Sequence, residues 1–126
     1  MASVIQELIT VLTEEQQLYE KIIPIASEKK NVIIKNNLES LQEITEQEQL
    51  AIDQVTVLEK KRSEVIVNIG ILLNRKPEEL TLKEIIRLLE NQPKEQKQLS
   101  QIHDQLKQTV QELKNINIQN KSLIVQ

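Results

Sequence analysis

The chain has 126 residues, a net charge of −3 at pH 7, one glycine, three prolines, one tyrosine and no phenylalanine, tryptophan or cysteine. Helix formers dominate while strand-forming aromatic residues are almost absent, which predicts an all-α fold. The negative net charge argues against a nucleic-acid partner, and the absence of cysteine excludes disulfides. The most apolar run, residues 65–73, is far shorter than the ~20 residues of a transmembrane segment. We therefore expect a soluble, cytoplasmic protein that forms a single helical domain over residues 1–126.

The first predicted helix covers residues 3–35. Its apolar residues recur in alternating steps of three and four, which is the period of one helix face. Pro24 lies inside the pattern, and because the apolar stripe keeps its phase on both sides, we expect a kink there rather than an end. Two charged residues, Glu15 and Lys29, occupy stripe positions.

The second predicted helix, residues 38–73, repeats this period, with Glu48 and Arg62 as its charged stripe positions. A helix of this length needs tertiary packing to be stable, so other helices must cover its apolar stripe. Asn36 and Asn37 separate it from the first helix, and so short a connection predicts an antiparallel hairpin. Asn36, with Glu39 three residues later, is read as a variant capping box.

The four charged stripe residues predict two ion pairs across the hairpin. Facing residues of an antiparallel pair have a constant sum of residue numbers, and the pairs Glu15–Arg62 and Lys29–Glu48 share the same sum. We expect these pairs to fix the register of the two helices. The alternative is that all four side chains extend into water at the edge of the stripe.

Two further helices complete the predicted fold. Residues 74–80 contain Pro77 and form a loop, and Thr81 with Glu84 is a capping box that begins a short helix over residues 82–91. The last helix covers residues 93–124, with Pro93 in its first turn. We thus expect an elongated antiparallel helical hairpin or bundle of three long helices plus one short helix.

The last helix has an unusual surface. Residues 99–126 carry only five charged side chains and are rich in Gln and Asn outside the apolar stripe. Such a surface suits packing against a partner helix. The stripe either covers the hairpin or binds a partner. The same stripe can also serve both roles, one after the other.

The sequence contains no recognisable catalytic pattern. His103 is the only histidine, so a transition-metal site has no second imidazole or thiolate ligand. The carboxylates are distributed as on solvated helix faces, and one glycine cannot form a phosphate-binding loop. We expect a protein that is not an enzyme and binds no metal and no cofactor.

The pattern of short motifs resembles the FlgN-like flagellar export chaperones. The motifs follow one another in order along nearly the whole chain. They are Leu18-Tyr19-Glu20, Glu28-Lys29-Lys30, Leu38-Glu39-x-Leu41, Glu46-Gln47-Glu48-Gln49, Leu58-Glu59-x-x-Arg62, Thr81-Leu82-x-Glu84-Ile85-Ile86 and Ile116-Asn117-x-x-Asn120-x-x-Leu123-Ile124. Members of that family usually continue beyond the Leu-Ile pair, whereas this sequence stops at Gln126.

This resemblance implies a chaperone that guards hook-filament junction proteins, holds their carboxy-terminal amphipathic helices and delivers them to the type III export gate. It also implies that the last helix binds the client. The client-binding residues would be Leu106, Val110, Leu113, Ile116, Asn117, Asn120, Leu123 and Ile124. The alternative is a structural coiled-coil or helical-bundle oligomerisation or adaptor protein unrelated to export. We expect a monomer or a weak homo-oligomer, because part of the apolar surface remains uncovered.

Overall fold

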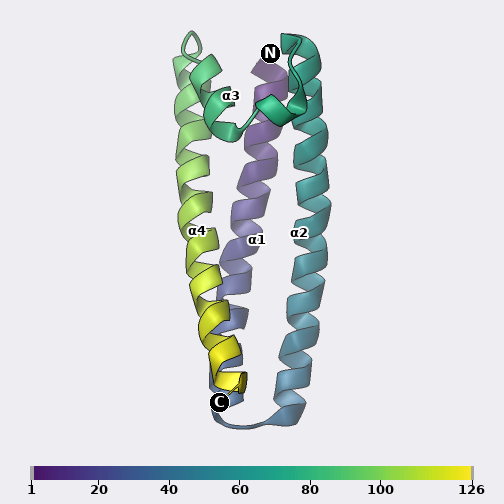
Figure 1. Cartoon of the computed structure of the whole chain (residues 1–126), viewed down its shortest axis with the longest axis vertical. Helices are drawn as coiled ribbons and strands as arrows, with labels where there is room; N and C mark the ends of the chain where they lie inside the picture. Colours follow the sequence, from purple (N-terminus) through teal and green to yellow (C-terminus); the bar gives the residue numbers. More distant parts are fainter. Residues whose placement is uncertain (1, 126) are drawn as a thin grey trace.

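The computed structural model describes the backbone of residues 2–125 and the side chains of residues 3–123. It contains the helices α1 (Ala2–Ile34), α2 (Leu38–Leu73), α3 (Leu82–Leu88) and α4 (Pro93–Val125), and the short 3-10 helix η1 (Pro77–Glu79). These residues include no strand, so the expected all-α fold is confirmed (Figure 1). α1 continues through Pro24.

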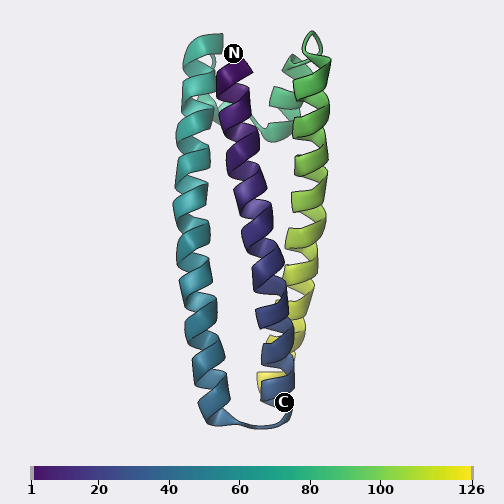
Figure 2. The ribbon, with the colours of Figure 1, turned by 180° about the vertical axis from the view of Figure 1, so that it is seen from behind.

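The three long helices form an elongated assembly in which α1 lies between α2 and α4 (Figures 1 and 2). α2 runs antiparallel to α1, and α4 runs in the same direction as α1. Both flanking helices pack along α1, while α2 and α4 make little direct contact with each other. α1 is therefore the central helix, against which both other long helices pack.

The hairpin turn uses its two asparagines in different roles. Asn36 has a left-handed backbone with φ of 55°. Its N–H donates to the Ile33 carbonyl at 3.0 Å, and the Asn37 N–H donates to the Val32 carbonyl at 3.3 Å. These two hydrogen bonds form a Schellman motif that ends α1.

The helix cap at the start of α2 is Asn37, so the expected capping role of Asn36 is wrong. The Asn37 side chain accepts a hydrogen bond from the Ser40 N–H at 3.1 Å. A cap needs extended backbone, which Asn37 has, whereas Asn36 is already committed to the left-handed conformation. The cap therefore lies one residue later than the sequence suggested.

The main core lies at the end of the molecule where α3 and η1 cross between α2 and α4 (Figure 1). Side chains from all four α-helices and the η1–α3 connection meet there. The buried members are Ile5, Leu8, Val11, Leu12, Val65, Ile69, Leu80, Ile85, Leu89, Leu99, Ile102 and Leu106. This cluster anchors the first half of α4.

The short helix α3 begins as expected and ends early. Thr81 Oγ1 accepts from the Glu84 N–H at 3.2 Å, but the Glu84 carboxylate pairs with Arg75 and Arg87, so only half of the capping box forms. The predicted end at residue 91 is wrong, since α3 stops at Leu88. Leu89 is fully buried in the core and turns the chain toward α4, with its N–H donating to the Ile86 carbonyl at 3.1 Å.

Candidate functional site: the second half of α4

Both predicted ion pairs of the hairpin are present. Lys29 Nζ lies 2.8 Å from Glu48 Oε1, and Arg62 Nη1 lies 3.2 Å from Glu15 Oε2. The Glu15 side chain is only 2% exposed, while that of Arg62 is 32% exposed. Because each pair joins α1 to α2, the pairs favour this register over shifted ones.

Glu15 sits in an electrostatically costly position. Burial raises the pKa of its carboxyl group, the Arg62 charge acts in the opposite direction, and the Glu59 charge adds to the increase. Its Oε1 has no hydrogen-bond partner among the described residues. Burial also raises the pKa of the neighbouring Tyr19, with further contributions from Glu59 and Glu15. The Glu15–Arg62 pair thus joins α1 to α2, but it requires the burial of a carboxylate, which is unfavourable.

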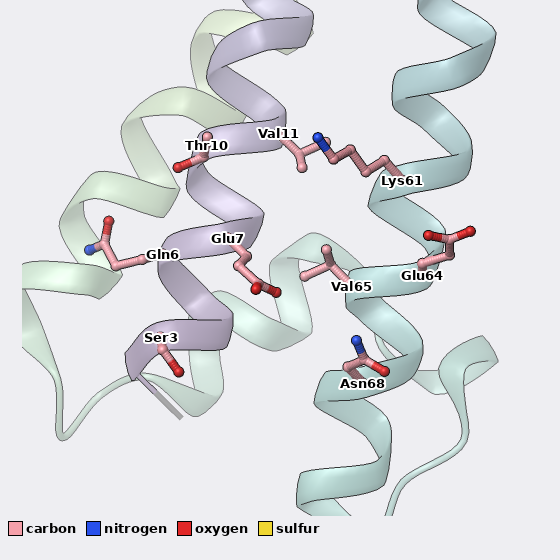
Figure 3. A pocket seen from close by; sticks show the side chains of 9 residues that line it. All are labelled: Ser3, Gln6, Glu7, Thr10, Val11, Lys61, Glu64, Val65 and Asn68. Atoms are coloured by element: carbon pink, nitrogen blue, oxygen red, sulfur yellow. The ribbon is translucent and has the colours of Figure 1, made fainter.

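A groove lies between α1 and α2 on the face shown in Figure 3. Val11 and Val65 are its apolar residues, and the other lining side chains are polar or charged. Lys61 extends from α2 toward Val11, and Glu7 extends from α1 into the space between the helices (Figure 3). Within the described part of the chain, no group of three or more acidic or histidine side chains is arranged to hold a metal ion. The groove thus offers an amphipathic surface.

The structure divides the predicted client-binding residues of α4 into two sets. Leu106 is 6% exposed and belongs to the main core. Beyond it, Leu113 is half-buried against a small second cluster around Ile22, whereas Val110 and Asn117 are exposed. Ile116 and Leu123 are half-buried, Asn120 is buried, and the Ile124 side chain lies outside the described part.

Polar contacts hold much of the second half of α4 on α1. Gln16 Nε2 donates to Thr109 Oγ1 at 2.8 Å, and Asn120 Nδ2 donates to the Ala26 carbonyl at 2.8 Å. The side-chain oxygens of Gln16 and Asn120 are buried without partners among the described residues. From residue 107 to residue 123 no apolar side chain is fully buried. This half of α4 is therefore held less firmly than the half that enters the main core.

A shallow depression lies along one side of this half. Its lining residues are Val110, Leu113, Lys114, Asn117, Ile118 and Lys121. Val110 is 41% exposed and Ile118 is 58% exposed. Ile118 and the two lysines are not among the residues predicted from the sequence, because they lie outside the apolar stripe of α4. The seven-residue spacing of the lysines was the available signal.

These features define an elongated, all-helical protein with an incompletely buried terminal helix, which is a geometry suited to binding other helices. A protein-family model described as "FlgN protein" matches residues 1–126, the whole chain. The chain belongs to the FlgN family, a family of flagellar export chaperones that bind protein clients.

Comparisons with curated proteins and with solved structures found no match. No helix within residues 2–125 combines the length and apolar character that a membrane span requires.

Proposed function

We propose that this protein is a cytoplasmic type III export chaperone for hook-filament junction proteins. It binds their carboxy-terminal amphipathic helices, prevents premature assembly and delivers them to the export gate. Membership of the FlgN family supports this role. The observation that carries the assignment to α4 is that its second half presents apolar side chains that the hairpin leaves partly exposed.

The spacing of these side chains fits a helical client. Val110, Leu113 and Asn117 follow one another at steps of three and four, and Ile118 lies beside them. This is the pattern by which a helix surface receives an amphipathic partner helix. Covering Val110 and Ile118 would contribute ~1 kcal/mol each, because about half of each side chain is already buried.

The half-buried residues extend the proposed site. Leu113, Ile116 and Leu123 face the α1 side of α4 in the free protein, and the buried Asn120 bonds to Ala26. Because polar contacts contribute much of this attachment, the client can compete with α1 for the same stripe. In this proposal the stripe covers the hairpin in the free chaperone and binds the client in the complex.

Calorimetry with a synthetic peptide of the last ~40 residues of a hook-filament junction protein tests the proposal. The wild-type protein should bind, and a Leu113→Asp/Ile116→Asp variant should lose binding while circular dichroism shows an intact helical fold. A Leu50→Asp/Val57→Asp variant is the matched control, because both residues are exposed on α2. Absence of binding by the wild type, or equal loss in both variants, would contradict the assignment.

The second candidate function is structural self-association. The exposed apolar side chains Leu50, Val57, Ile71 and Leu72 on α2 favour it. Sedimentation equilibrium of the wild type and of Leu50→Asp/Val57→Asp distinguishes the two functions. A stable wild-type oligomer that this variant dissociates would favour the structural function, whereas a monomer that binds the peptide favours the chaperone.

A further inference from the structure

Three lysines form a row along one side of α4. Lys107, Lys114 and Lys121 are separated by seven residues, and each step of seven turns only ~20° around a helix, so all three lie on one side. Their side chains are exposed. Lys114 and Lys121 line the apolar depression described above.

The two lysines of the depression are not neutralised by their own helix. Neither Lys114 nor Lys121 has an acidic residue three or four positions away, which is the spacing at which helix side chains pair. Glu112 is two positions from Lys114, which places it on another side of α4. Among the described residues, neither lysine takes part in an ion pair.

We propose that the client helix received at this site carries an acidic edge beside its apolar stripe, with Asp or Glu residues seven positions apart that pair with Lys114 and Lys121. This inference rests on the proposed chaperone function and specifies which helices the chaperone accepts. Two α-helices have the same rise, so carboxylates seven residues apart match the ~10.5 Å between the lysines along α4. The apolar stripe of such a helix would at the same time cover Val110 and Ile118.

The charges select the client more than they strengthen its binding. A helix with a basic edge would place like charges next to Lys114 and Lys121, which disfavours it. Exposed ion pairs contribute little to affinity, but complementary charges raise the association rate and are screened by salt. The arrangement therefore predicts salt-dependent binding of acidic-edged helices and rejection of basic-edged ones.

The test measures peptide binding to a Lys114→Glu/Lys121→Glu variant by calorimetry and stopped-flow kinetics. The probe is the synthetic peptide of the last ~40 residues of a hook-filament junction protein. We expect about tenfold weaker binding, mainly from slower association, and a weaker dependence on salt than in the wild type. Lys94→Glu/Lys97→Glu is the control, because it makes the same charge change at exposed positions in the first two turns of α4.

The outcomes separate this inference from the proposed function. If the wild type does not bind the peptide, the chaperone proposal itself fails. If the wild type binds and Lys114→Glu/Lys121→Glu binds equally well, the acidic edge is refuted while the chaperone proposal stands. Equal weakening in the control variant would also refute it, because the effect would then come from net charge. A charge-swapped peptide with Lys in place of its edge carboxylates should recover binding to Lys114→Glu/Lys121→Glu.

Discussion

Removing Arg62 should destabilise the protein by leaving a buried charge without its partner. In the structure Arg62 Nη1 donates to Glu15 Oε2 at 3.2 Å, and the other carboxylate oxygen of Glu15 already lacks a partner among the described residues. Deleting one member of a buried pair costs ~3–5 kcal/mol. Since the Arg62 side chain is 32% exposed, we expect Arg62→Ala to lie near the lower limit, about 3 kcal/mol. The melting temperature should fall by roughly 10 °C.

The loss should depend on pH in a defined direction. The folded-state pKa of Glu15 is raised above the ordinary value of 4.5, so its contribution to stability is fully present below that value and is lost as pH rises through the folded pKa. Arg62 lowers the pKa of Glu15, and its removal should therefore move this window to higher pH. The destabilisation by Arg62→Ala should accordingly be larger at about pH 7.5 than at about pH 5.

Urea unfolding followed by circular dichroism measures both effects, and a double-mutant cycle identifies their source. Glu15→Gln removes the buried charge, so Arg62→Ala should cost less than ~1 kcal/mol in that background. If Arg62→Ala is equally destabilising with Glu15 and with Gln at position 15, Arg62 acts through packing alone. The electrostatic reasoning would then be refuted.

Substitutions at three further positions test other parts of the structure. A Cβ added in Gly70→Ala would lie 2.7 Å from the Arg75 carbonyl oxygen, so we expect a loss of ~1–2 kcal/mol in chemical unfolding, and a gain would contradict this close approach. Asn36→Ala should cost ~1 kcal/mol because of the left-handed backbone while Asn36→Gly should not, and equal stability of the two variants would contradict that conformation. Asn120→Leu replaces a buried amide that has an unpaired oxygen, so α4 should pack more firmly on α1. Hydrogen exchange in the second half of α4 should then slow about tenfold, and client binding should weaken. Unchanged exchange would contradict the polar attachment of α4.

The register of the hairpin could be predicted because facing residues of an antiparallel pair have a constant sum of residue numbers. Charges interrupted two regular apolar stripes, and only one antiparallel alignment paired all four of them. The exact cap and the end of α3 could not be predicted, because they depend on tertiary contacts. Asn37 is the cap because Asn36 has a left-handed backbone, and α3 ends just before Leu89, which is buried in the core.

The role of the α4 stripe could not be read from its periodicity. The same three-four spacing serves a helix that covers its own core and one that binds a partner. Leu106 lies in the core, while Val110 is exposed one turn later. The division between the two sets depends on how far the main core extends along α4. That limit depends on the side chains that α1, α2 and α3 bring to the core, which the pattern of α4 itself does not show.

Hydrogen exchange with and without the client peptide tests the central claim most directly. In the free protein, amides of residues 110–123 should exchange faster than those of residues 96–106, because the latter belong to the half of α4 that enters the main core. Addition of the peptide should slow exchange chiefly in residues 106–123 of α4. Protection confined to α1 and α2, with α4 unchanged, would contradict the account and move the binding site to the hairpin.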